Sequence, residues 1–253
     1  MAHPSVAVLE YHLVSYRRMW RSTLFSSFAM PVLLFVGVGA SVGEYVDRGD
    51  ALPVPYLHYI AGGMLAFTGM QVAITESGFP VQSYMTWDKV YHGMAATPVR
   101  VADILAGHLL YIALRVAAAS AAFLVVMVPF GAVGSAWAVL TPLVAALVGL
   151  SVAAPMFAYS ASVTGPYLMT VMRFATMVMT FFSGAYFPVD QLREPLSMVA
   201  YPLPLWHGVE LCRAAALGTG TAWPVAAHVG VLAAWFAGGL ALAHPRFVKR
   251  LAT

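Results

Sequence analysis

The chain has 253 residues, of which 61% are hydrophobic and 9% are charged, and its formal net charge is +3. A soluble domain carries roughly 25% charged residues, so this composition excludes an ordinary soluble protein. The basic residues stand at the ends of apolar segments and give no reason to expect a nucleic-acid partner. Apolar runs longer than the roughly 18 residues that mark a membrane span predict an all-α polytopic membrane protein.

Residues 1–21 are predicted to form an interfacial helix that lies on membrane lipids. Apolar side chains recur there at spacings of three and four, which is typical of one helical stripe, and basic residues flank them. Such a helix suits a negatively charged leaflet. The alternative is a basic flank that only fixes orientation. The stripe consists of Val6, Leu9, Leu13, Tyr16 and Trp20.

Six transmembrane helices are predicted after this segment. Most Lys and Arg side chains fall in connections that face the cytoplasm if both termini are cytoplasmic. We therefore expect a multi-pass protein of a bacterial plasma membrane with both termini inside. The predicted spans are Ser22–Gly43, Leu57–Phe79, Ile104–Val128, Ala136–Tyr159, Tyr167–Phe187 and Trp223–Ala243.

The stretch from Glu76 to Arg115 contains a polar connection between the second and third predicted spans. A polar piece of this kind has to leave the lipid, and its length suits a short helix across the cytoplasmic membrane face. We interpret it as the part on which something outside the membrane acts.

Glu76 and Arg115 are predicted to form an ion pair that braces the second and third spans. An unpaired charge at mid-bilayer costs roughly 2.5–3.5 kcal/mol on insertion scales. Side chains lean toward the N-terminus of their helix, and the two spans run in opposite directions, so the two side chains approach each other. The alternatives are an Arg115 side chain that reaches the membrane surface, or a role on the substrate path.

The fifth predicted span carries methionines and small polar side chains at spacings of three and four. Methionine is adaptable and suits promiscuous apolar surfaces, so this set is a candidate lining for a path between two paired subunits. Helix packing or lipid contact is the alternative. The set is Met169, Met172, Thr176, Met179, Thr180 and Ser183.

Residues 184–222, between the fifth and sixth spans, are apolar but interrupted by prolines. The segment is too short to span the membrane twice. It is predicted to form a re-entrant hairpin of two short helices in the outer leaflet. The second helix would run from Pro204 to Leu217, with Pro in its first turn and Gly218 at its end.

The segment from Phe182 to Ala214, FSGAYFPVDQLREPLSMVAYPLPLWHGVELCRA, resembles the signature of the membrane subunits of type 2 ABC exporters, the ABC-2 permease family. A Ser-Gly pair, an aromatic-Pro pair, an apolar helix, a Pro-Leu pair and the terminal Arg213 carry the likeness. The block ES…KVYHGMAATPVRVADILAG…LR is similar to the branch of nodulation-factor (lipo-oligosaccharide) exporters, with daunorubicin-type drug exporters as close relatives. Residues 1–253 are therefore expected to form one ABC-2 transmembrane domain.

This resemblance implies the permease subunit of an ATP-driven exporter of amphipathic or lipid-like compounds, either drugs and antibiotics or lipo-oligosaccharides. Two permeases, identical or related, would pair. Two separate ATPase subunits, which hold ATP and Mg, would dock on a coupling helix that corresponds here to residues 83–95. Trp87 and Tyr91 would share one exposed face of that helix, which favours an interface over a polar loop without a partner. The candidate contacts are Trp87, Asp88, Lys89, Tyr91 and His92.

The P-loop and H-E-x-x-H motifs are absent from the sequence. Neither Lys89 nor Lys249 stands in a P-loop, so ATP hydrolysis is expected in a partner chain, and no cofactor or metal is expected in this one. A proton-coupled secondary transporter that uses Glu76 is an alternative, against which the lack of visible repeats argues. A membrane-embedded transferase is a weaker alternative because it would need clustered acids or histidines. Among the histidines, His108 stands out because it lies inside a predicted span.

Overall fold

The structure is a computed structural model that describes residues 3–24, 29–49, 52–163, 165 and 167–252. Within those ranges all regular structure is helical, as the composition predicts. In the same described ranges, three short 3₁₀ turns supplement the α-helices: η2 (Val128–Phe130), η3 (Ala136–Leu140) and η4 (Val189–Gln191). The α-helices are α1 (Pro4–Leu24), α2 (Met30–Arg48), α3 (Tyr56–Ser77), α4 (Phe79–Thr86), α5 (Val90–Ala95), α6 (Val101–Met127), α7 (Thr141–Ser162), α8 (Tyr167–Phe182), α9 (Leu196–Ala200), α10 (Pro204–Leu217) and α11 (Val225–Leu251).

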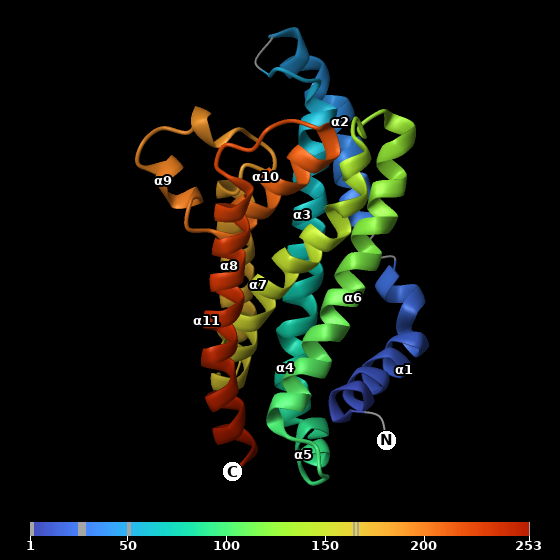
Figure 1. The fold of residues 1–253 in the computed structure, drawn as a ribbon, viewed down its shortest axis with the longest axis vertical. Coiled ribbons are helices and arrows are strands. Elements are labelled where there is room, and N and C mark those ends of the chain that lie inside the picture. Colours follow the sequence, from blue (N-terminus) through green and yellow to red (C-terminus); the bar gives the residue numbers. More distant parts are fainter. Residues whose placement is uncertain (1–2, 25–28, 50–51, 164, 166, 253) are drawn as a thin grey trace.

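Helix α3 lies at the centre of the bundle, where it packs against α2, α6, α7 and α10 (Figure 1). Its glycines allow backbones to approach closely, as small residues do in membrane helix packing. A Cβ atom on Gly63 would lie 2.5 Å from the carbonyl oxygen of Ala185, and one on Gly69 would lie 2.7 Å from that of Ala145. The glycines of α3 therefore allow neighbouring backbone segments to pack closely against this helix.

Among the described residues, four helical segments are long and apolar enough to cross a membrane, and they coincide with the predicted second, third, fourth and sixth spans. The predicted first span crosses residues 25–28, which lie outside the described residues, and its helix α2 ends in a turn with charged side chains. The predicted fifth span corresponds to α8, which has 16 residues and would be about 24 Å long. That is shorter than the roughly 30 Å hydrocarbon core, so six spans remain a prediction. The four segments are Tyr56–Thr86, Val101–Phe130, Ala136–Ser162 and Val225–Leu251.

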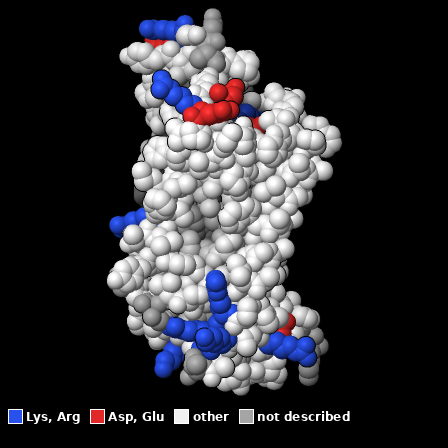
Figure 2. Space-filling view, turned by 90° about the vertical axis from the view of Figure 1, so that its left-hand side faces the viewer, with Lys and Arg blue, Asp and Glu red and all other residues white. Residues whose placement is uncertain are grey.

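The two ends of the molecule differ in charge. Helix α5 and both chain termini lie toward one end, and α9 and α10 lie toward the other (Figure 1). Basic side chains gather at the α5 end, whereas most acidic side chains in this view gather toward the α10 end (Figure 2). These two ends are called the α5 end and the α10 end below.

Helix α1 packs on α6 through a face that the sequence did not single out. Val8 and His12 are the buried residues there, and Val8 fits against Gly107 of α6. Val6 and Leu13 of the predicted membrane-facing stripe are each 39% exposed, and contact of this stripe with lipid stays a prediction. Apolar side chains occur on several sides of α1, so spacing alone does not select one. The side chain of Trp20 lies outside the described part of the chain.

The segment between α8 and α11 contains the second short helix that the sequence predicts. Helix α10 begins with Pro204 and ends at Leu217, and Gly218 follows with a left-handed φ of 73°. The first helix of the predicted hairpin is smaller than expected, because only η4 and the five residues of α9 are helical. Insertion of this segment into a leaflet remains a prediction.

Candidate functional site

The predicted single helix over residues 83–95 is wrong, because the structure has two helices with a corner between them. The carbonyl of Ser83 accepts hydrogen bonds from the backbone N–H groups of Trp87 and Asp88, and its hydroxyl donates to the Asp88 carboxylate (Oγ to Oδ2, 2.5 Å). Lys89 then adopts a left-handed backbone with φ of 51°, which turns the chain into α5. The corner is thus built by local hydrogen bonds and one unusual residue.

The corner separates the side chains that were predicted to share one exposed face. Trp87 is 59% exposed and packs against Phe79, with ring centroids 5.6 Å apart. Asp88 and Lys89 are also exposed, and His92 is half-buried. Tyr91 is completely buried, so its predicted role as a surface contact is wrong. The turn at Lys89 directs Tyr91 inward.

Tyr91 connects α5 to the interior of the bundle. Its hydroxyl lies 2.5 Å from Nδ1 of His108 on α6, and its ring packs against Phe247 of α11 at 5.7 Å. Burial raises the pKa of the Tyr91 phenol well above its ordinary value of 10, so the hydroxyl keeps its proton and can donate it to Nδ1. A movement of α5 would therefore be felt directly by α6 and α11.

His12 and His108 extend this contact to α1. Their rings stack with centroids 4.0 Å apart, and Tyr84 of α4 and Tyr111 of α6 lie against the same pair. Burial lowers the pKa of His12 from 6.5 to about 4, so this imidazole is neutral near neutral pH. The sequence singles out only His108, because His108 lies inside a predicted span, whereas His12 lies in the segment predicted to be interfacial.

The structure brings Glu76 and Arg115 together as a buried ion pair. The carboxylate of Glu76 on α3 contacts Nη1 of Arg115 on α6, and their side chains are 15% and 7% exposed. The guanidinium also lies 4.5 Å from the ring centroid of Tyr16 on α1, and Nη1 lies 3.5 Å from the hydroxyl of Tyr111. This ion pair thus contacts three helices, α1, α3 and α6. It adjoins the cluster of His12, His108, Tyr84 and Tyr111 through Tyr111.

The residues predicted as a substrate path on α8 do not form one surface. Met169 is exposed, whereas Met172 and Met179 pack toward the core, and Ser183 is buried. The hydroxyls of Thr176 and Thr180 donate to carbonyls of their own helix at 2.8 and 2.6 Å, which leaves them less available to a ligand. The most exposed side of α8 is a different one, and it carries Tyr167, Phe174, Met177 and Phe181.

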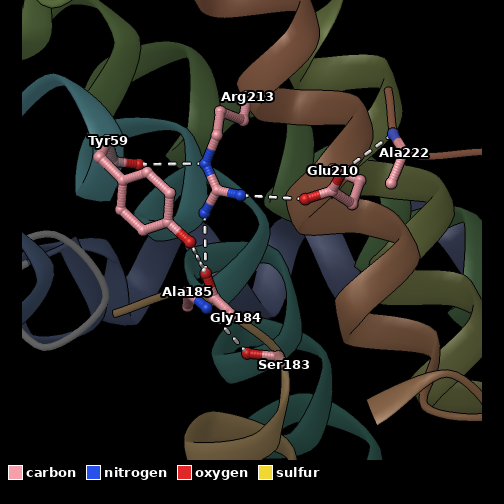
Figure 3. Close-up of polar contacts among 7 residues, drawn as sticks. All are labelled: Tyr59, Ser183, Gly184, Ala185, Glu210, Arg213 and Ala222. Atoms are coloured by element: carbon pink, nitrogen blue, oxygen red, sulfur yellow. Dashed lines mark hydrogen bonds and ion pairs between the residues drawn. The ribbon is translucent and has the colours of Figure 1, made fainter. Parts of the chain in front are cut away.

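Arg213 ties together the α10 end of the molecule (Figure 3). Its Nε donates to the carbonyl of Tyr59 at 3.3 Å, its Nη2 to the carbonyl of Gly184 at 2.7 Å, and its Nη1 to Glu210 at 3.0 Å. The guanidinium also lies 3.8 Å from the Tyr59 ring centroid. The second oxygen of Glu210 accepts from the backbone N–H of Ala222. This residue therefore links α3, the turn after α8, α10 and the segment before α11.

Within the described part of the chain, no three His, Cys, Asp or Glu residues are grouped so that they could hold a metal ion. Cys212 of α10 is buried, and burial raises its pKa to about 12. The thiol is therefore a poor nucleophile at neutral pH.

Comparison with known proteins gives one consistent result. The family described as "ABC-2 type transporter" matches residues 6–217. Nodulation protein J of Rhizobium leguminosarum bv. viciae is 30% identical over 230 residues, which cover 90% of this chain and 87% of that protein. Nodulation protein J of Rhizobium meliloti is 27% identical over 230 residues, covering 90% of this chain and 86% of that protein.

Proposed function

From the premise that the chain belongs to the ABC-2 type transporter family, we propose that it is the permease subunit of an ATP-driven exporter of amphipathic compounds. The ATPase would be a separate chain that holds ATP and Mg. Two copies of it would serve a pair of permeases, formed by this chain with a second copy or with a related permease. The observation that carries the proposal is the exposed corner at Trp87 and its direct connection to the core through Tyr91.

The surface proposed to meet the ATPase consists of Phe79, Trp87, Asp88 and Lys89. The two aromatic rings contact each other at a tilt of 32°, and their side chains are 44% and 59% exposed. Aromatic residues are enriched at protein interfaces, and the acid and base beside them can set orientation. His92 lies at the edge of this surface, and Tyr91 lies behind it.

Force on this corner would reach the membrane helices by contact. Tyr91 touches His108, His108 stacks on His12, and Tyr111 links this cluster to Arg115. In this proposal the Glu76–Arg115 pair braces α3 against α6, so that the two helices move together behind the corner. The contacts of Tyr91 with His108, of His108 with His12 and of Arg115 with Glu76 each join different helices, which is the physical requirement for transmission.

The proposed orientation places the α5 end in the cytoplasm of a bacterial cell. The basic side chains gathered at that end support it, because cytoplasmic loops carry an excess of Lys and Arg (Figure 2). Both termini would then be cytoplasmic, and α1 would lie along the inner membrane surface.

The compound proposed to be moved has a large apolar part. Between α6 and α11 lies a hollow of about 650 Å³ that is lined almost wholly by apolar side chains, including Leu105, Leu109, Phe236 and Leu240. Stripping a small hydrophilic solute of its water in such surroundings is costly, whereas an amphiphile can keep its tail in lipid. A glycolipid-like product or a hydrophobic antibiotic fits this description.

Reconstitution tests this function directly. The permease should copurify with a separate P-loop ATPase chain when the two are expressed together, and ATP hydrolysis by the pair should rise with amphipathic compounds. Transport that runs on a proton gradient without any ATPase would instead favour a secondary transporter that uses Glu76. If only small hydrophilic solutes stimulate hydrolysis, the exporter class survives but the proposed substrate class does not.

A further inference from the structure

A pocket of about 470 Å³ opens at the α10 end, beside the Arg213 contacts. Its volume lies within the range of roughly 300–1,000 Å³ that is usual for small-molecule sites. The walls come from the loop before α3, from η4, from α10 and from the segment that leads into α11. Unlike the apolar hollow between α6 and α11, this pocket combines aromatic rings with polar side chains.

The aromatic side of the pocket is a fixed platform. The ring planes of Tyr201 and Trp223 are tilted by 30° with centroids 5.4 Å apart, and the two side chains remain 37% and 39% exposed. The buried ring of Trp206 meets both of them edge-on, at 5.0 and 4.9 Å, and holds them in place. Exposed rings that are braced from behind suit a ligand with an apolar face, because little order has to be imposed on binding.

The electrostatics of the pocket disfavour an anionic ligand. Nε, Nη1 and Nη2 of Arg213 already donate to protein acceptors, and both oxygens of Glu210 already accept. Arg213 and Glu210 therefore form an ion pair with each other. No other Lys or Arg lines the pocket, so it has no unpaired cation to hold a phosphate.

The hydrogen-bonding groups that remain open are of mixed character. Asp190 is exposed and contributes a carboxylate that only accepts, Gln191 contributes an amide, and Thr219 contributes a hydroxyl. The face of the Tyr59 ring, which a cation would otherwise use, is covered by the Arg213 guanidinium. The pocket thus offers donors, acceptors and ring faces together, with a single unpaired charge.

We propose that this pocket binds a neutral carbohydrate group. A sugar ring presents C–H bonds on one face, which pack against the electron-rich face of an aromatic ring. Its hydroxyls both donate and accept, which matches Asp190, Gln191 and Thr219, and the bonds to the Asp190 carboxylate are the strongest of these. Use of the pocket as an exit site for the polar head of an exported amphiphile rests on the proposed function, but the binding itself does not.

The binding test uses the full-length permease in an amphipol or in a detergent that lacks a sugar head group. Neutral trisaccharides of glucose and of N-acetylglucosamine are titrated by calorimetry, with choline and inorganic phosphate as charged comparisons. At least one neutral sugar should bind, and Asp190→Asn should weaken it roughly tenfold or more, as expected for loss of charged hydrogen bonds. Trp223→Leu should weaken it as well, because the ring platform is lost.

Matched controls keep this result specific. Glu194→Gln removes another exposed acid of the same segment, and Trp137→Leu removes another exposed tryptophan, but neither residue lines the pocket. Both variants should bind sugar like the unmodified protein. Asp190→Asn preserves side-chain shape at an exposed position, so an unchanged melting curve shows that folding is intact.

Two outcomes overturn the inference. One is that no neutral sugar binds or that choline binds instead, and the other is that Asp190→Asn and Trp223→Leu leave sugar binding unchanged. Failure of the proposed function would give a different result: sugars bind as expected, but no ATPase copurifies and no amphiphile is exported. Export without sugar binding, conversely, removes only the carbohydrate site.

Discussion

The guanidinium of Arg115 on α6 is paired with the carboxylate of Glu76 on α3, and both groups lie inside the bundle. The ring of Tyr16 on α1 lies 4.5 Å from the same guanidinium. Taking one partner away would leave the other charged group in surroundings that solvate it poorly. Such a pair makes the relative position of these helices sensitive to single substitutions.

Glu76→Gln and Arg115→Gln should therefore each destabilise the protein strongly. Breaking a buried pair costs about 3–5 kcal/mol in soluble proteins, because one charge is left uncompensated. The exchange Glu76→Arg with Arg115→Glu should recover part of the loss. A double-mutant cycle on thermal stability in detergent measures the coupling energy, and a value of zero would reject the brace.

The exposed pair of Glu44 and Arg48 on α2 is the control for this cycle. Its side chains are 66% and 70% exposed, so solvent screens the interaction. The same Gln substitutions there should show almost no coupling. Equal coupling at both sites would mean that burial contributes nothing to the Glu76–Arg115 pair.

Trp87→Ala should weaken association with the ATPase and leave the fold unchanged. Truncation of an interface aromatic often costs 2 kcal/mol or more, which is about thirtyfold in affinity. Copurification at a series of salt and detergent conditions, or a direct titration, measures the effect. Trp137→Ala is the control, because Trp137 is 67% exposed but lies in η3, away from α4 and α5.

Tyr91→Phe separates the surface role from the internal one. The ring can still pack on Phe247, but Nδ1 of His108 loses its hydrogen-bond partner. The free energy of unfolding should fall by an amount on the order of 1–3 kcal/mol, as for a buried polar group that is left unsatisfied. Unchanged stability together with lost ATPase binding would return Tyr91 to the contact surface.

The parts of the fold that the sequence predicted correctly depend on local signals. The limits of α10 follow from Pro204 in the first turn and from Gly218, whose left-handed conformation ends the helix. Long apolar runs likewise locate α3, α6, α7 and α11. These features depend on neighbouring residues in the chain and need no knowledge of the tertiary structure.

The parts that could not be predicted depend on distant contacts. Lys89 is not a residue that usually adopts a positive φ, so the corner before α5 has no sequence signal. Tyr91 faces inward because Phe247 and His108, which come later in the chain, form its pocket. The same limit applies to Arg213: its place in a family signature was recognised, but its hydrogen-bond partners were not.

Acidification should destabilise the protein in part through His12. Burial lowers the pKa of His12 to about 4 in the folded protein, against 6.5 ordinarily. Between these values the unfolded chain binds more protons, so stability is complete above about pH 6.5 and falls as the pH drops toward 4. His12→Phe keeps the ring packing but cannot titrate. The variant should therefore lose less free energy of unfolding on acidification, by an amount on the order of 3 kcal/mol.

Arg213→Lys should lower thermal stability although it conserves charge. The guanidinium donates to three separate acceptors and covers the Tyr59 ring, whereas one ammonium group cannot reproduce that planar arrangement. Each lost bond to a charged donor is worth about 1.5–3 kcal/mol. Arg193→Lys, at an exposed position in the same segment, should be silent, and an equally large effect there would contradict this account.

Thiol labelling in cells tests which end of the molecule faces outward. In a Cys212→Ala background, Asp190→Cys places a thiol on an exposed position at the α10 end, and Lys89→Cys places one at the α5 end. An impermeant maleimide should label position 190 in intact cells and position 89 only after permeabilisation, because the basic α5 end is expected to be cytoplasmic. Leu205→Cys should react slowly in both conditions, since that side chain is fully buried. Labelling of position 89 from outside would reverse the proposed orientation and remove the corner at Trp87 as a docking surface for a cytoplasmic ATPase.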